Sequence, residues 1–251
     1  TTWSTGAAIR VTPRSSVIVD GGQQYFRFDS GQDYRGIDLA TSLNRRADVQ
    51  RLQFNLALTP LTSWLTSVET IQDRFDDSRL RNADSVRVMT GFDLRPAALI
   101  SGKVLVGVRR FNILSDSLPD YNGLVASASA TMTVGRNRVS VLEQRDVAYS
   151  YGELLPYSVQ TTTTAEVRRR VGRSWDALGR GTLNYMRYRG AGDSQPVDRI
   201  KSVGAGVGYL LGRTMRIGAN IDYSTRAVET TVASGFSGVR AGLALSYGLA
   251  Q

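Results

Sequence analysis

Apolar and polar residues alternate along several long segments of this chain. Between residues 215 and 223, apolar side chains stand at the odd positions, from Met215 to Tyr223, and polar or small ones stand at the even positions. The same alternation runs through residues 51–58, 124–134 and 239–247. Because successive side chains of a β-strand point to opposite faces, a period of two predicts strands with one apolar and one polar face.

The length of these strands favours a membrane protein over a soluble one. The alternating runs last about ten to twelve residues, roughly twice the length of a strand in a globular protein. At about 3.3 Å per residue and a tilt near 40°, such a strand spans roughly 25–30 Å, the thickness of the hydrocarbon core of a bilayer. The longest apolar stretches, such as residues 104–108, fall far short of the roughly 20 residues that a spanning helix needs.

The connections alternate between short and long. Tight turns are predicted at 59–62, 94–97, 135–137, 172–174 and 211–213, and longer polar loops at 75–84, 111–121, 147–156, 190–198 and 224–237. Outer-membrane barrels have short periplasmic turns and longer extracellular loops. The sequence therefore predicts an all-β fold: a closed antiparallel transmembrane β-barrel of about 12–14 strands, forming a single domain over residues 1–251.

Residues 1–58 leave the strand assignment open. Residues 12–15 are typical of a periplasmic turn and residues 29–33 of an outer loop, which conflicts with a periplasmic turn at 59–62 if residues 44–48 form a further hairpin. Three alternatives remain: one assignment is wrong, residues 34–58 form one long strand, or a strand precedes Thr1. No signal peptide is recognisable at Thr1, so we expect a mature chain or the ordered part of a longer one.

Aligning the strands by their apolar faces assigns the other face to the lumen. The predicted lipid face includes Leu52, Phe54, Leu56, Met132, Ile217, Ile221, Leu243 and Leu245. The predicted lumen face receives the basic residues Arg10, Arg51, Arg87, Lys103, Arg109, Arg168, Arg180, Arg216 and Arg240, and the acidic residues Asp38, Glu69, Glu166 and Asp222. A cation that faces lipid at the midplane costs about 2–4 kcal/mol, which favours inward placement. Either these arginines pair with lumen carboxylates and fill a narrow barrel, or they line a hydrated passage for anions.

Two further patterns bear on the barrel wall. Gly204, Gly206 and Gly208 fall on the predicted lumen face, where missing side chains leave room for a plug, a bulky neighbour or a solute. Aromatic residues near predicted strand ends are typical of the girdles at membrane interfaces. We assign six residues to these girdles: Trp3, Trp64, Trp175, Tyr209, Tyr223 and Tyr247.

Composition excludes several kinds of chemistry. The chain has no cysteine and therefore no disulfide or thiolate metal site, and it has no histidine, the commonest general base and metal ligand. We expect no catalytic residue, no metal site and no cofactor. The net charge of +9 comes from arginines spread along the chain, apart from the run 168–170, so we expect no nucleic-acid partner.

From residue 58 to its end, the chain resembles the putative β-barrel porin 2 family of bacterial outer-membrane proteins. The stretches that carry the resemblance are 58–63 (LTPLTS), 73–75 (DRF), 98–102 (ALISG), 106–111 (VGVRRF), 119–126 (PDYNGLVA), 145–151 (RDVAYSY) and 206–209 (GVGY). The resemblance implies an outer-membrane location and, for some members, an association with exopolysaccharide export, and it supplies no catalytic or ligand residues. The chain departs from the common barrel ending in a terminal aromatic residue, because four residues follow Tyr247.

Three classes of function follow. The first is a polar, arginine-rich passage for small or polymeric anionic solutes such as acidic saccharides. The second is a structural or anchoring barrel whose lumen is filled by side chains and which binds partner proteins or displays surface loops. The third, an enzyme, would depend on carboxylates alone, for instance Asp73 with Asp76 and Asp77. We expect not an enzyme but a barrel whose partners are the lipid bilayer and lipopolysaccharide, with an anionic saccharide, a partner protein or a second copy of the chain as further candidates.

Overall fold

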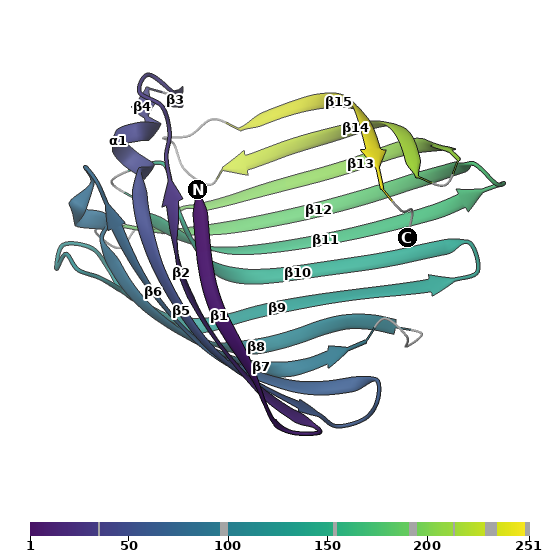
Figure 1. Ribbon diagram of the computed structural model, residues 1–251. Coiled ribbons are helices and arrows are strands. Elements are labelled where there is room, and N and C mark those ends of the chain that lie inside the picture. Colours follow the sequence, from purple (N-terminus) through teal and green to yellow (C-terminus); the bar gives the residue numbers. More distant parts are fainter. Residues whose placement is uncertain are drawn as a thin grey trace.

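Almost all regular structure in this protein is β-strand. The computed structural model describes residues 1–34, 36–95, 100–152, 155–190, 195–212, 214–228 and 235–248. Thirteen strands form one antiparallel sheet in which each strand pairs with its neighbours along the chain, and two short strands form a separate hairpin (Figure 1). No helix in the described ranges is long and apolar enough to cross a membrane.

The strands of the large sheet are eleven to fifteen residues long. They are β1 (Thr2–Thr12), β2 (Ser15–Phe26), β5 (Arg45–Ala57), β6 (Thr62–Phe75), β7 (Ala83–Leu94), β8 (Ile100–Ile113), β9 (Tyr121–Val134), β10 (Asn137–Tyr149), β11 (Tyr157–Val171), β12 (Trp175–Arg189), β13 (Val197–Leu211), β14 (Met215–Val228) and β15 (Phe236–Tyr247). The remaining elements are β3 (Asp33–Tyr34), β4 (Ile37–Asp38), the helix α1 (Leu39–Leu43) and the 3₁₀ turn η1 (Arg79–Arg81).

Short and long connections lie at opposite ends of the sheet. Residues 13–14, 58–61, 135–136 and 172–174 connect strands at one end, which we call the turn end. Residues 27–44, 76–82, 114–120 and 150–156 connect strands at the other, which we call the loop end. The predicted alternation is confirmed at these connections. Parts of the predicted turns at 94–97 and 211–213 and of the predicted loops at 147–156, 190–198 and 224–237 lie outside the described residues.

The first 58 residues supply three strands of the large sheet, β1, β2 and β5, and the short hairpin of β3 and β4. The turn at 12–15 and the outer connection over 29–33 are confirmed. A hairpin at 44–48 is wrong, because Asn44 caps α1 and β5 begins at Arg45. One strand over 34–58 is also wrong, because Asp38 ends β4 and its side chain caps α1 by accepting a hydrogen bond from the Ala40 amide.

The sheet does not close within the described residues. Figure 1 shows a strongly curved sheet whose edges are β1 (purple) and β15 (yellow). In the described residues β1 pairs only with β2, and β15 only with β14. Neighbouring strands are all antiparallel and their number is odd, so β1 and β15 run in the same direction. The antiparallel all-β class and the strand number are confirmed, whereas the predicted closure is not seen.

The two faces of the sheet differ as the alternation predicts. The predicted apolar set lies on the convex outer face, where Leu52, Ile221 and Leu243 are 50, 54 and 86% exposed. The opposite inner face carries ion-paired residues such as Glu69 and Arg109, which are buried. An apolar surface that is exposed over so many strands requires an apolar solvent or a partner.

Strict alternation breaks near the loop end of β10. Asp146 binds Arg87, and the ring of Tyr149 packs on that of Phe75 at 4.9 Å, so both contact inner-face residues although they are three positions apart. Pairing of β10 with β9 ends at Arg145. The backbone is therefore irregular here, which places both side chains on one face.

We expect proteases to separate the two ends of the sheet. A protease site inserted at Asp116, in the loop-end connection 114–120, should be cleaved on intact cells because long connections of outer-membrane barrels face outward. The same site inserted at Gly135, in the turn-end connection 135–136, should be spared. Cleavage at Gly135 with protection at Asp116 would reverse this topology.

Candidate functional site

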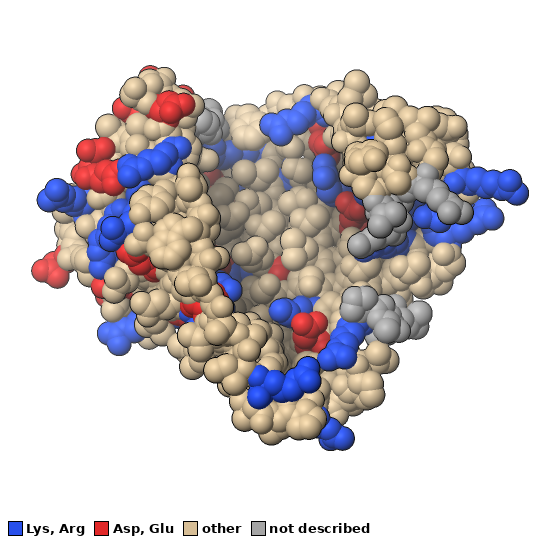
Figure 2. Space-filling model, in the orientation of Figure 1, with Lys and Arg blue, Asp and Glu red and all other residues tan. Residues whose placement is uncertain are grey.

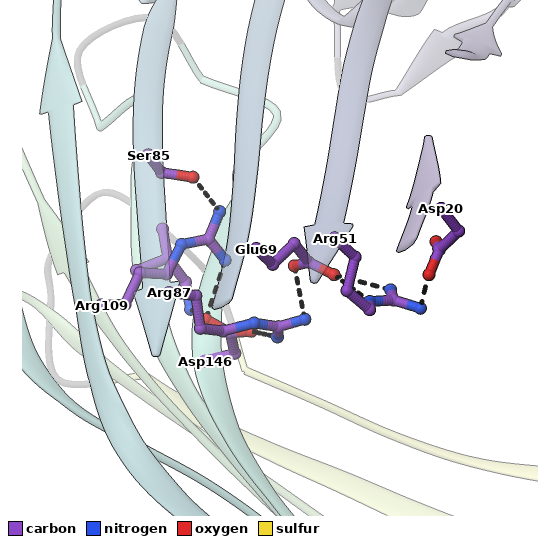
Figure 3. A network of polar contacts seen from close by, with 8 residues as sticks. Asp20, Arg51, Glu69, Ser85, Arg87, Arg109 and Asp146 are labelled. Atoms are coloured by element: carbon purple, nitrogen blue, oxygen red, sulfur yellow. Dashed lines mark hydrogen bonds and ion pairs between the residues drawn. The ribbon is translucent and has the colours of Figure 1, made fainter. Parts of the chain in front are cut away.

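A network of ion pairs crosses the inner face between β2 and β10 (Figure 3). Glu69 lies between two arginines: its carboxylate is 2.6 Å from Arg51 Nη2 and 2.6 Å from Arg87 Nη2. Asp146 in turn binds Arg87 and lies 2.8 Å from Arg109 Nη1. Asp20 and Ser85 extend the network at its two ends, at 3.7 Å from Arg51 and 3.0 Å from Arg109. We call Asp20, Arg51, Glu69, Arg87, Arg109 and Asp146 the charged network.

Two carboxylates of the charged network, Glu69 and Asp146, each lie between two arginines. Arg87 and Arg109 stand directly opposite each other on β7 and β8, an arrangement that is unfavourable for two cations. Asp146 binds both and so removes the repulsion. The Glu69 side chain is only 5% exposed, so a loss of either neighbouring arginine would leave a poorly solvated charge. This part of the inner face is therefore neutralised, beside a small cavity of about 290 Å³.

Glycines on β13 make room for further ion pairs. A Cβ atom at Gly208 would lie 2.2 Å from the Arg216 guanidinium, and one at Gly204 would lie 2.0 Å from the Asp222 carboxylate. Across this strand Arg216 reaches Asp176 on β12 at 2.6 Å. In the same way Arg180 reaches Asp222 on β14 at 2.7 Å. The glycine positions are thus occupied by bulky neighbours, one of the predicted alternatives.

Aromatic residues fill part of the inner face at the loop end. The rings of Phe75, Phe111, Tyr149 and Tyr157 form a chain of contacts with centroids 4.9–5.8 Å apart. We call these four residues the aromatic cluster. They adjoin a buried apolar core that includes Phe111, Tyr121 and Tyr157.

Arg81 of η1 ties this cluster to the loop-end connections. Its guanidinium lies over the rings of Phe75 and Tyr149 at 5.0 and 5.8 Å. It donates hydrogen bonds to the carbonyls of Ser42 at 2.8 Å, Ser150 at 2.5 Å and Pro156 at 2.9 Å. Only 1% of this residue is exposed. Arg81 therefore holds three connections together above the inner face.

A larger cavity opens at the turn end between β9 and β15. Its volume is about 830 Å³. Its charged lining residues are Arg136, Arg138, Glu166, Arg168, Arg170, Asp176 and Arg216. We call it the turn-end cavity. Figure 2 shows the concave inner face of the sheet as a hollow flanked by basic and acidic side chains.

As in the charged network, two arginines face each other in the turn-end cavity, but among the described residues no carboxylate binds both. Arg138 and Arg168 are direct partners across β10 and β11. Glu166 lies 3.4 Å from Arg168, and Asp176 pairs with Arg216. Within the described residues, Arg136, Arg138 and Arg170 have no ion-pair partner, in contrast to the charged network. The cavity is therefore a place where an external anion would relieve repulsion.

The nine predicted lumen cations lie on the inner face. Seven of them form ion pairs: Arg51, Arg87, Lys103, Arg109, Arg168, Arg180 and Arg216. Arg240 faces Asp222 across β14 and β15 without an ion pair within the described residues. Arg10 also lies on the inner face, where it is paired with Ser16 in the register of β1 and β2.

The predicted set of acidic residues requires correction. Glu69, Glu166 and Asp222 lie on the inner face, whereas Asp38 lies outside the large sheet, at the N-terminus of α1. The prediction also missed six acidic residues with inner-face ion pairs: Asp20, Asp73, Asp93, Asp146, Asp176 and Asp198. Asp73 and Asp198 were missed because the strands extend into segments with loop composition.

Five of the six predicted girdle aromatics lie near strand ends. Trp64, Trp175, Tyr209 and Tyr247 lie within three residues of the turn end, and Trp3 lies at the loop end of β1. The rings of Trp175 and Tyr209 touch, with centroids 4.9 Å apart. Tyr223 is an exception, because it lies on the outer face inside β14, five residues from its loop end.

Among the described residues, no group of three or more acidic side chains is arranged to hold a metal ion. A search of curated proteins finds no match to the chain. The family described as "Putative beta-barrel porin 2" matches residues 5–246, nearly the whole chain. The antiparallel sheet of long strands agrees with that description. The chain belongs to this β-barrel porin family.

Proposed function

We propose that this protein is an outer-membrane barrel that passes anionic solutes, and that the turn-end cavity is where it attracts them. The observation that carries this proposal is the pair of opposed arginines, Arg138 and Arg168, of which only Arg168 forms an ion pair among the described residues, with Glu166. Arginine binds carboxylate and phosphate oxygens in paired hydrogen bonds. A cavity of about 830 Å³ falls within the roughly 300–1,000 Å³ that accommodates small molecules. Acidic saccharides are one class of solute with this chemistry.

The two faces of the sheet support placement in a membrane. The long strands of the sheet expose apolar side chains on the outer face, and the ion pairs lie on the inner face, as in a transmembrane barrel. Because β1 and β15 run in the same direction, closure requires either a parallel pair between them or one further strand antiparallel to both. We propose that the sheet is closed in the membrane, since open sheet edges are not tolerated in hydrocarbon.

Because most inward cations are ion-paired, we expect the preference for anions to arise at the turn end of the passage. The charged network and the pairs across β13 neutralise most of the predicted lumen cations. In the part of the chain that the structure describes, the cations without an ion pair in the turn-end cavity are Arg136, Arg138 and Arg170. Fixed charge in a narrow passage concentrates counter-ions. We therefore expect selectivity to depend on these three residues more than on the charged network.

A second candidate function is an anchoring barrel that conducts nothing. The aromatic cluster favours this alternative, because Arg81 and four rings close part of the loop end. In that case the ion pairs would serve stability alone. Conductance separates the two candidates.

The reversal potential under a salt gradient tests the proposed passage. In a planar bilayer the protein should conduct anions in preference to cations, most strongly at low salt, because screening acts over about 10 Å at 0.1 M. The double substitution Arg138→Glu and Arg170→Glu should shift the preference toward cations.

The matched control carries the same change of charge elsewhere. Arg110 and Arg187 point outward near the loop end, so Arg110→Glu with Arg187→Glu should leave the reversal potential unchanged. Cation selectivity of the unaltered protein would refute the anion passage. Absence of any conductance in the bilayer would favour the anchoring barrel.

A further inference from the structure

Glu143 places a carboxylate on the outer face in the middle of a strand. It is the seventh of the thirteen residues of β10, and its register partners are Ala128 on β9 and Thr163 on β11. Its carboxylate accepts a hydrogen bond from the Thr163 hydroxyl. On the other described strands of the large sheet, outward charges such as Arg46 and Arg187 lie within five residues of a strand end.

Arg145 lies two positions further along β10, where its register partners are Ala126 and Thr161. Its guanidinium donates to the Thr161 hydroxyl at 3.1 Å and to the Leu124 carbonyl at 3.2 Å. Glu143 and Arg145 are thus half-buried residues of opposite charge beside two threonines. We call Glu143, Arg145, Thr161 and Thr163 the outer charged patch. Charged groups that face lipid are costly, so this patch calls for a polar partner.

The outer charged patch is flanked by small residues on β9, whereas Leu183 and Tyr185 on β12 are the register partners of Thr163 and Thr161. Ala126, Ala128 and Ala130 flank it on β9, and Ala165 flanks it on β11. Gly179 and Gly181 lie further along β12, opposite Val167 and Ala165, and an added Cβ there would meet no atom within 4 Å. Elsewhere the outer face carries large residues such as Phe92, Ile221 and Leu243. Small residues allow close approach of a second backbone in a membrane.

We propose that the outer charged patch is the contact between two copies of this chain, related by a twofold axis along the membrane normal. A twofold contact brings the same surface of both copies together, so it must be self-complementary. Glu143 and Arg145 meet that condition, because Glu143 of one copy faces Arg145 of the partner subunit and the reverse. The proposal rests on the membrane placement given above but not on conduction by the bore.

Cysteine crosslinking tests this contact, and the natural chain has no cysteine to interfere. Ala128→Cys lies beside Glu143 and should give a product of twice the chain mass with a short bismaleimide in native membranes. Ala219→Cys, on the outer face of β14, is the matched control and should give none. Absence of the product at residue 128, or a product of another mass, would overturn self-association.

Charge exchange tests the proposed pairing itself. Arg145→Glu in the Ala128→Cys background opposes two carboxylates and should lower the crosslinked fraction about tenfold or more. Adding Glu143→Arg restores opposite charges across the axis and should restore the product. Failure of the double exchange to restore crosslinking in a protein that still inserts would overturn the pairing. Conductance should be unchanged in all three variants, so failure here is distinct from failure of the proposed passage.

Discussion

Arginine in place of Ile221 is expected to destabilise the protein by about 2–4 kcal/mol. Ile221 is the seventh of the fourteen residues of β14 and is 54% exposed on the outer face. If that face contacts lipid, the substitution places a cation near the middle of the bilayer. The free energy of unfolding, measured by urea titration in lipid vesicles, gives the size of the loss.

The neighbouring position provides the control. Asn220 points inward, its register partners are Gly206 and Gly242, and its amide already donates to Asp222 at 2.9 Å. Asn220→Arg therefore has space and a carboxylate partner, and we expect a change within about 1 kcal/mol. Equal losses at residues 220 and 221 would contradict the assignment of the two faces.

Loss of the Arg81 side chain is expected to have a comparable effect. Arg81→Ala removes the side-chain donor from three carbonyls; Pro156 keeps its bond from the Ser150 amide, whereas the carbonyls of Ser42 and Ser150 lose their buried donor. Each unsatisfied buried acceptor costs about 1–3 kcal/mol, so we expect a loss of about 2 kcal/mol or more. Fluorescence of the three tryptophans during urea unfolding provides the measurement.

The same variant tests whether the loop end limits conduction. Without Arg81 the connections above the aromatic cluster lose their common anchor, so single-channel conductance should rise. Arg81→Lys keeps the charge and part of the hydrogen bonding, and it should fall between the alanine variant and the unaltered protein in both measurements. Unchanged stability in Arg81→Ala would contradict the anchoring role of this residue.

Most of the fold follows from the alternation of side chains. Because the period is two, the face of each residue from Met215 to Tyr223 follows from its position in the strand, without any knowledge of neighbouring strands. Connection lengths then give the antiparallel order, which the pairing of the thirteen strands confirms. Closure could not be predicted in the same way, because it depends on how the two edge strands meet rather than on any local pattern.

The candidate site was harder to predict because ion pairs join residues that are distant in sequence. The alternation predicts that Arg87 and Arg109 face inward, yet it does not predict that Asp146 neutralises both. Asp146 lies where β10 becomes irregular, so its face cannot be assigned by counting positions. Arg138 belongs to the turn-end cavity for a similar reason, because its importance comes from its register with Arg168.

Collision of spin labels with oxygen and with a water-soluble nickel complex tests the central claim most directly. Single cysteines at residues 217–222 can each carry a nitroxide in the otherwise cysteine-free chain, reconstituted in lipid bilayers. We predict high oxygen accessibility at 217, 219 and 221, where side chains face lipid, and high nickel accessibility at 218, 220 and 222, where they face the hydrated interior. Equal accessibility to nickel at all six positions, or protection from both reagents at the odd positions, would contradict a membrane-spanning barrel with a polar interior.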